Sequence, residues 1–195
     1  ELDGTQIVVD AYAGVSTFAV LIADKAKKVI AVEESASALI DANVNTQNIS
    51  NITMLQAKTE ELLASIAEDE IDAVILDPPR SGCMQGTLNA LLTFPPSKIV
   101  YISCDPETLS RDLAILTAGP FKIKNVQPID MFPQTHHIES VTTLLRDDER
   151  LKRINARQSL VLASNSPRRV EIFQALGLAF EVRASSVEEP PVPDG

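Results

Sequence analysis

Cys104 is the residue whose type and position point most directly to covalent chemistry. It follows an apolar run over residues 99–103 and lies just before a predicted helix. In that place, the helix N-terminus stabilises the thiolate form of a cysteine. A cysteine that ends a buried strand is also a common small core residue, so the residues alone leave both roles open. Cys83 has no neighbour suited to activate it and is predicted to be a core residue.

A second candidate site is the Asp-Pro-Pro-Arg segment at 77–80, at the end of another predicted strand. Ligands of open α/β sheets bind at the carboxyl ends of strands. The two prolines restrict the backbone to an extended turn, so Asp77 and Arg80 are held in place at its two ends. A rigid surface loop with an ion pair is the alternative interpretation.

Small residues at 10–18 predict a tight turn between the first strand and the first helix, with Gly14 at its centre. Such a turn lets backbone amides approach a ligand, and the helix N-terminus favours negative charge. Glu33 follows roughly 20 residues later, the spacing of a carboxylate that accepts hydrogen bonds from ribose hydroxyls. Each feature alone has a structural explanation, but together they favour a nucleoside-containing cofactor.

The elements that position these residues alternate along residues 6–145. Short β-branched runs predict strands over 6–10, 28–33, 52–56, 73–77, 99–103, 122–128 and 140–145. Helices are predicted over 16–26, 35–46, 59–67, 86–94 and 107–117. This alternation predicts a Rossmann-like parallel α/β sheet with helices on both faces. The loop at 130–139 joins the last two strands, which suits an antiparallel hairpin at one edge of the sheet.

The composition predicts a protein of the cytoplasm. Hydrophobic residues make up 45% of the 195 residues, and no charged-then-apolar leader opens the chain. No apolar run approaches the roughly 20 residues that span a bilayer. Two cysteines make no disulfide framework, and His136 and His137 lack further ligands at a metal-binding spacing, so no metal is predicted. Residues 1–144 hold 9 Lys and Arg against 19 Asp and Glu, which is too acidic for a free-standing nucleic-acid binder.

Three motifs resemble the RNA (uracil-5-)-methyltransferase family, whose members make 5-methyluridine in transfer RNA or ribosomal RNA. They are Asp-Pro-Pro-Arg at 77–80, Ser-Cys-x-Pro-x-Thr-Leu-x-Arg-Asp at 103–112 and Asp-Met-Phe-Pro-Gln-Thr-x-His-x-Glu at 130–139. The resemblance covers about residues 5–145. It implies a methyltransferase fold with S-adenosyl-L-methionine as cofactor and RNA as substrate. It also implies that Cys104 attacks C6 of uracil and that Glu139 removes the C5 proton.

The same resemblance assigns the remaining site residues. The cofactor-binding positions are Tyr12, Gly14, Thr17, Glu33 and Asp77, and the substrate-binding positions are Arg80, Phe132 and His137. Ala13 and Ser16 stand where the family usually has Cys and a second Gly. Ser16 is therefore expected to add a side chain beside the cofactor. The family's upstream RNA-binding module is not among these residues, which accounts for the acidic balance and predicts a chain that folds but is inactive alone.

The C-terminal segment has a different character. Residues 147–157 are densely charged and are predicted to form a solvated linker or a surface helix. Residues 158–195 resemble the start of the Maf nucleotide pyrophosphatases, through the segments at 162–169 and 187–189. Glu189 matches an acidic active-site position there, but most of that fold is missing, so no pyrophosphatase activity is expected. The expected organisation is a methyltransferase domain at 1–146, a linker at 147–157 and a truncated Maf-like segment at 158–195.

Three other functions stay open at this point. The Asp-Pro-Pro turn is similar to that of amino-methylating enzymes, which need no cysteine nucleophile. A second alternative is a catalytically inactive RNA-binding or assembly module. A third is a nucleotide hydrolase whose active residues lie in the C-terminal segment 158–195. Activity of a Cys104→Ala variant, cofactor binding and nucleoside triphosphate turnover distinguish these functions from uracil methylation.

Overall fold

The computed structural model describes residues 2–65, 71–131, 133–135, 138–157, 160–162 and 180–182. The chain divides into two compact units, residues 1–148 and residues 149–195. Among the described residues, no helix is long and apolar enough to cross a membrane.

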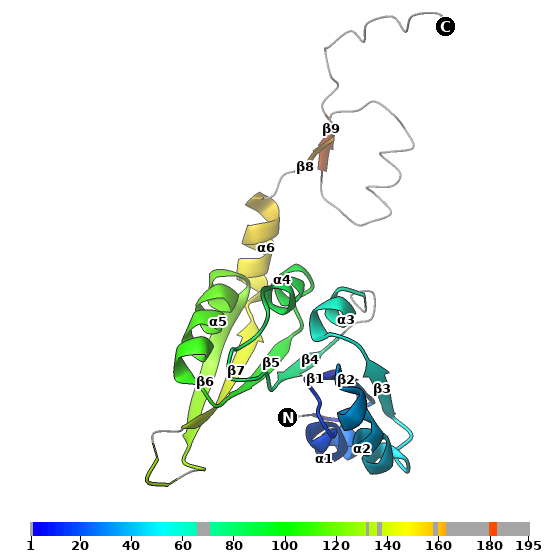
Figure 1. The fold of residues 1–195 in the computed structure, drawn as a ribbon. Coiled ribbons are helices and arrows are strands. Elements are labelled where there is room, and N and C mark those ends of the chain that lie inside the picture. The colour runs from blue at the N-terminus through cyan, green and yellow to red at the C-terminus, as the bar shows by residue number, and fades with distance from the viewer. Residues whose placement is uncertain are drawn as a thin grey trace, which may run out of the picture. The chain divides into compact units, whose positions relative to one another are not determined.

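The first unit is built on a sheet of seven strands (Figure 1). They are β1 (Ile7–Ala11), β2 (Lys28–Glu33), β3 (Ile52–Gln56), β4 (Ala73–Leu76), β5 (Lys98–Ser103), β6 (Phe121–Ile129) and β7 (Glu139–Arg146). Their order in the sheet is β3-β2-β1-β4-β5-β7-β6. The first five strands pair in parallel, whereas β7 is antiparallel to both β5 and β6. The predicted Rossmann-like sheet and its antiparallel hairpin at one edge are confirmed.

Helices cover both faces of this sheet, as predicted. They are α1 (Thr17–Ile22), α2 (Ala36–Thr46), α3 (Thr59–Ser65), α4 (Gln85–Thr93) and α5 (Pro106–Ala118). Figure 1 shows α1 and α2 on one side of the sheet and α3, α4 and α5 on the other. The first predicted helix ends early, because residues 23–25 tighten into a 3₁₀ turn of the kind that often closes a helix. The predicted end of α3 at Ala67 falls outside the described residues.

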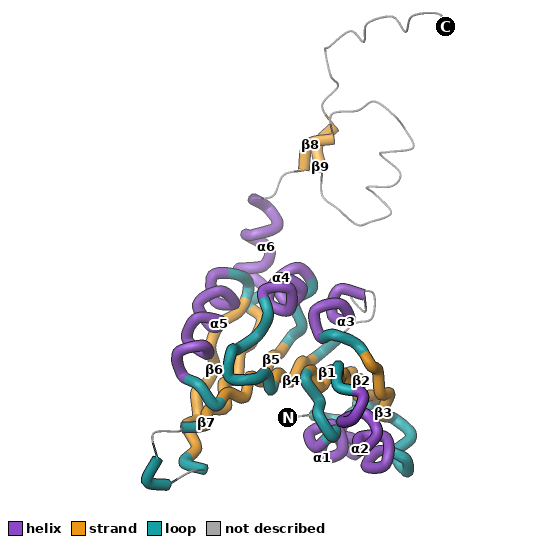
Figure 2. The backbone as a smooth tube through the Cα atoms, viewed as in Figure 1, coloured by secondary structure: helices purple, strands orange, loops and turns teal. Residues whose placement is uncertain are grey.

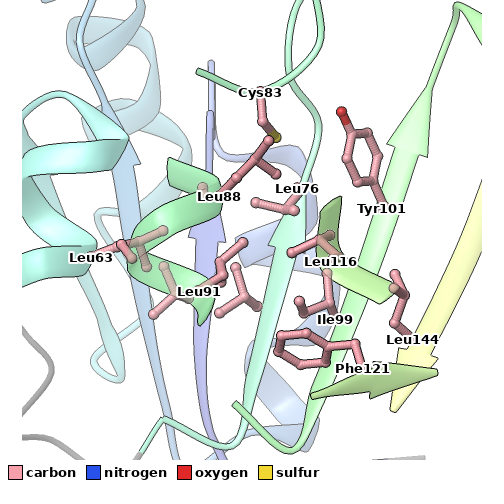
Figure 3. Close-up of a cluster of buried hydrophobic side chains, with 14 of the residues drawn as sticks. Leu63, Leu76, Cys83, Leu88, Leu91, Ile99, Tyr101, Leu116, Phe121 and Leu144 are labelled. Carbon is pink, nitrogen blue, oxygen red and sulfur yellow. The ribbon is translucent and has the colours of Figure 1, made fainter. Parts of the chain in front are cut away.

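Alternate residues of the strands feed two separate hydrophobic cores, as the period-two geometry of a strand requires. Val9, Leu76 and Ile99 face α3, α4 and α5 in the larger core, part of which is drawn in Figure 3. Val8 and Ile75 face the opposite way, into the core beneath α1. Since both faces of the central strands are packed, the positions left free for ligands are at the strand ends.

The second unit begins with a charged helix. Residues 148–157, predicted as a linker or a surface helix, form α6 (Asp148–Arg157), in which the exposed Lys152 and Glu149 form an ion pair at 2.8 Å. Two short strands, β8 (Leu160–Leu162) and β9 (Phe180–Val182), pair in parallel. The residues expected to carry the Maf-like motif, at 163–169 and 187–189, lie outside the described residues.

Candidate cofactor and catalytic site

The topology gathers the predicted site residues at one edge of the sheet. β1, β4 and β5 run in parallel, so the turn after β1, the Asp77 turn after β4 and Cys104 after β5 all lie at their carboxyl ends. Figure 2 shows the backbone leaving these strands as loops. β7 runs the other way and pairs Ser140 with Ser103, so Glu139 at the start of β7 and Cys104 after β5 each lie one residue beyond this pair. The predicted nucleophile and the predicted proton acceptor therefore both lie at the same end of the β5–β7 ladder.

Hydrogen bonds on both sides fix the backbone around Cys104, whose side chain is half-buried. The Ser103 hydroxyl donates to the carbonyl of Asp105 (2.9 Å) and accepts from the Asp105 amide (3.1 Å). The Asp105 side chain then caps α5 by accepting the amide of Thr108 at 3.0 Å, which with the Pro at the first helical position defines the helix start. The backbone on both sides of Cys104 is thus held by hydrogen bonds, and the residue is partly exposed.

Arg80 lies near the Cys104 turn. The exposed Asp105 carboxylate has a lowered pKa, first because it accepts the Thr108 amide, with the Arg80 guanidinium contributing in the same direction. The Arg80 backbone carbonyl accepts a hydrogen bond from the Thr108 hydroxyl at 3.0 Å. The predicted substrate-binding arginine and the predicted nucleophile therefore belong to one region of the surface.

The turn after β1 has the geometry of a ligand-binding loop. Tyr12, Gly14 and Ser16 all have positive φ, at 63°, 55° and 68°. The Gly14 amide donates to Glu33 Oε2 at 2.8 Å, and the Ser35 amide donates to Glu33 Oε1 at 2.7 Å. A Cβ added at Gly14 would have no atom within 4 Å, so space is open beside this glycine. Glu33 stabilises the turn and, because each carboxylate oxygen accepts two hydrogen bonds, it keeps capacity for a ligand.

Tyr12 and Thr17 are the other two predicted cofactor-binding residues on this turn. The half-buried Tyr12 hydroxyl shares a 3.1 Å hydrogen bond with the hydroxyl of Thr87 on α4. Burial, followed by the neighbouring Cys83, raises the pKa of Tyr12 to about 12, so the phenol is neutral. Thr17 is exposed at the start of α1. Tyr12 and Thr17 thus flank Gly14 in the sequence, with the Tyr12 side chain packed against the larger core.

The position of Ser16 corrects one expectation. Its side chain is fully buried, and its hydroxyl donates to Met54 Sδ on β3 at 3.1 Å. The left-handed backbone at this residue turns the side chain into the protein rather than towards open space. Ser16 therefore adds no group beside the open turn, contrary to the prediction from its sequence position.

Three carboxylates make this sheet edge acidic. Asp10 is fully buried at the end of β1: its Oδ2 accepts the Ala19 amide at 2.9 Å, whereas Oδ1 has no partner among the described residues. Burial, with a smaller effect of Asp77, raises the pKa of Asp10 to about 7. Partial desolvation raises the pKa of Asp77 too, and the Glu139 carboxylate adds to this. Asp10 was not predicted as a site residue, although an acid that ends an apolar strand was the available signal.

Cys83 is a core residue, as predicted. It is 5% exposed, and burial raises the pKa of its thiol to about 12, so the thiol stays protonated. Phe132, His136 and His137 lie outside the described residues, so the structure places neither the predicted substrate contacts nor the histidine pair. In the described part of the chain, no cluster of three or more His, Cys, Asp or Glu side chains is arranged to hold a metal ion.

Comparisons with known proteins agree with this geometry. The sequence model of the tRNA (Uracil-5-)-methyltransferase family matches residues 3–147. A protein of Listeria innocua named as an uncharacterized RNA methyltransferase is 44% identical over 148 residues, covering 74% of this chain and 33% of the relative. An Enterococcus faecalis protein of the same description is 45% identical over 149 residues, with the same coverage. The chain thus spans about a third of the length of the curated relatives that it matches.

Solved structures lead to the same family. The tRNA (uracil-54, C5)-methyltransferase of Pyrococcus abyssi, crystallised with S-adenosyl-L-homocysteine, superposes with a TM-score of 0.65 at 32% identity. The superposition covers 74% of this chain and 35% of that one. An rRNA methylase of Streptococcus thermophilus shares the fold, with a TM-score of 0.62 at 18% identity over 74% of this chain and 89% of that one. With the family model matching about three quarters of its residues, the chain belongs to the tRNA (uracil-5-)-methyltransferase family.

Proposed function

We propose that this chain is the catalytic part of an enzyme that methylates C5 of uridine in RNA through a covalent adduct between Cys104 and C6. The observation that most supports the proposal is the pairing of Ser103 with Ser140, because Glu139 and Cys104 each lie one residue beyond this pair. The open Gly14 turn and Asp77 lie at the same edge of the sheet. This arrangement supports a proposed nucleophile, base and cofactor-binding turn that act at the same edge of the sheet.

The proposed reaction follows from the low nucleophilicity of uracil C5. C5 of uracil is a weak nucleophile until a group adds across the C5–C6 bond. The Cys104 thiolate forms a bond to C6, and the electron pair of the double bond moves towards C5. S-adenosyl-L-methionine would supply the methyl group that C5 takes up, with S-adenosyl-L-homocysteine as the leaving group. Glu139 then accepts the C5 proton, and Cys104 leaves C6 as the thiolate, which restores the C5–C6 double bond.

The acidic edge suits this cofactor. S-adenosyl-L-methionine carries a positive sulfonium and a positive ammonium group, and the carboxylates of Asp77 and Glu139 give the edge a negative potential, to which Asp10 adds as it ionises. Glu33, next to the open turn, is the proposed acceptor for the ribose hydroxyls, and Tyr12, Gly14 and Thr17 are the proposed walls of the cofactor site. Arg80, Phe132 and His137 are proposed to contact the RNA.

The substrate is proposed to be ribosomal or transfer RNA in the cytoplasm. With 9 basic and 19 acidic residues, residues 1–144 hold little of the positive charge that binds phosphates. The relatives are about three times as long as the matched segment. We therefore propose that residues 1–146 form the catalytic domain and that most of the affinity for RNA comes from other parts of the natural protein. The linker at 147–157 and the Maf-like identity of 158–195 are part of the same proposal.

The test is mass spectrometry of the protein incubated with S-adenosyl-L-methionine and RNA that contains 5-fluorouridine. Fluorine at C5 cannot leave as a proton does, so a covalent RNA–protein adduct should accumulate. It should be lost in Cys104→Ala and retained in Cys83→Ala, the matched control at the buried cysteine. The natural protein at full length and this chain alone are compared. An adduct in the full-length protein but not in this chain would mean that RNA binding needs parts of the protein outside this chain. The absence of an adduct from both proteins would contradict the proposed function.

A further inference from the structure

The turn that carries Arg80 is tied to the helix that follows Cys104. Arg111, on the second turn of α5, donates from Nη2 to the carbonyl of Ser81 (2.9 Å) and to that of Cys83 (3.4 Å). Its Nε donates to Asp112 Oδ1 at 2.9 Å. One guanidinium thus joins two carbonyls of the turn to a carboxylate of the helix, which uses the fork geometry that only arginine has.

Asp112 stabilises the same turn by accepting a hydrogen bond from its backbone. It is fully buried, and its Oδ2 accepts both the Cys83 amide (2.8 Å) and the Tyr101 hydroxyl of β5 (2.6 Å). With Arg111 on Oδ1, both carboxylate oxygens are bonded. A buried charge is costly unless it is paired and hydrogen-bonded, and Asp112 meets this condition only while the turn keeps its shape.

Gly82 shows how closely the turn is packed on these side chains. Its φ is +75°, and an added Cβ would lie 2.6 Å from Arg111 Nη2 and 2.7 Å from Asp112 Oδ2. Any side chain at this position would displace the two groups that hold the turn. Residues 81–83, Arg111 and Asp112 therefore form one unit, here named the turn clamp.

The turn clamp connects two predicted active-site residues that are 24 positions apart in the sequence. Arg80 immediately precedes the clamped residues, and its own carbonyl is bonded to Thr108 of α5. Cys104 lies two residues before the start of the same helix. We propose that Arg111 and Asp112 are positioning residues that fix Arg80 relative to Cys104, so that the arginine meets the uracil ring as the thiolate adds to C6. This inference rests on the proposed function.

Arg111 is better suited to the test than Asp112. Its own side chain is 51% exposed, whereas its partner Asp112 is fully buried, so the replacement must keep a positive charge beside this carboxylate. Arg111→Lys keeps the charge but cannot reach two carbonyls and a carboxylate together. The matched control is Arg146→Lys at the opposite end of β7. Arg146 also bonds one carbonyl, that of Pro95 (2.8 Å), and one carboxylate, that of Asp148 (2.7 Å).

The first measurement is the rate of adduct formation with saturating 5-fluorouridine RNA and cofactor, in a double-mutant cycle of Arg111→Lys and Arg80→Met. We expect Arg111→Lys to slow the reaction on the order of 10- to 100-fold, because small misplacements of active-site groups have effects of this size. The effect should fall below about twofold in the Arg80→Met background, and cofactor affinity should not change. Equal effects of Arg111→Lys in the two backgrounds would overturn the proposal, as would an equal loss in Arg146→Lys.

Amide hydrogen exchange of this chain tests the clamp without any reaction. Exchange at residues 82–84 should be on the order of tenfold faster in Arg111→Lys, while exchange at the turn 13–16 stays as in the parent. If neither this chain nor the natural protein at full length forms an adduct, the proposed function fails and exchange alone decides whether the turn clamp exists. Unchanged exchange at residues 82–84 would overturn the inference even in a protein that forms the adduct.

Discussion

Two turns at the same edge of the sheet contain a left-handed glycine for opposite reasons. Gly14, after β1, has open space where its Cβ would be, whereas Gly82, after β4, has Arg111 and Asp112 there. The space beside Gly14 is open to a ligand. The space beside Gly82 is filled by the side chains of Arg111 and Asp112. A glycine near an active site can therefore either leave space for a ligand or allow close packing of other side chains, and the atoms around it show which applies.

The buried acids beneath the two turns differ in the same way. Asp112 accepts hydrogen bonds on both carboxylate oxygens, so the closed turn is supported by a fully bonded carboxylate. Asp10 has only the Ala19 amide on one oxygen and no partner on the other within the described chain. The open turn is thus built on a carboxylate whose charge is poorly compensated, and the comparison yields four predictions.

The largest effect is expected from adding a methyl group to each glycine. Gly82→Ala should lower the free energy of unfolding by about 3 kcal/mol, since the left-handed backbone and the overpacking against Arg111 and Asp112 both contribute. Gly14→Ala should cost only about 1 kcal/mol, the backbone part alone, but should weaken S-adenosyl-L-methionine binding at least tenfold. Urea unfolding and titration calorimetry measure the two quantities. Equal losses of stability would contradict the distinction between the turns.

Much of this arrangement was predictable from the sequence. The bounds of β2 and β3 were predicted correctly, because apolar runs with turn residues on both sides define strands clearly. The gathering of Asp77 and Cys104 at one edge followed from parallel strands, whose carboxyl ends share that edge. The family motifs identified the same residues through their spacing.

What could not be predicted depends on contacts between distant segments. Arg111 and Asp112 were part of a recognised motif, but their partners at 81–83 lie about 30 positions earlier and meet them only after α5 packs on the sheet. Ser16 was assigned to the cofactor side because the family usually has a glycine at this position, and the sequence does not tell which way the side chain of a left-handed residue points. The use of Glu33 to bond the Gly14 amide was likewise not predictable, since it needs the register of β1 and β2.

The next effect is the pH dependence of stability caused by Asp10. Its pKa is about 7 in the folded chain and about 4 in an unfolded one, so between these values the folded state binds more protons. Stability should therefore fall as the pH rises, by roughly 2–3 kcal/mol between pH 5 and pH 8. Asp10→Asn should remove most of this slope in denaturant unfolding at several pH values. An unchanged slope in the variant would mean that other groups cause it.

A smaller effect is expected at the closed turn from Tyr101→Phe. The change removes one of the donors to the buried Asp112 and should cost about 1–2 kcal/mol in unfolding free energy. Thr142→Val is the control, because Thr142 is paired with Tyr101 across β5 and β7, is fully buried, and its hydroxyl has no partner among the described residues. That control should be neutral or stabilising. A larger loss of unfolding free energy in Thr142→Val than in Tyr101→Phe would contradict the role of Asp112 in stabilising the turn.

The smallest effect belongs to Ser16→Gly, which restores the residue usual in the family. Glycine relieves the left-handed backbone at φ 68° but loses the hydrogen bond to Met54 and adds chain entropy to the unfolded state. These contributions oppose each other, so the unfolding free energy should change by less than about 1 kcal/mol. Because the serine side chain points into the core, affinity for S-adenosyl-L-methionine should stay within about twofold of the parent. A large gain in affinity, measured by titration calorimetry beside Gly14→Ala, would show that this serine does face the cofactor and that the open turn extends as far as residue 16.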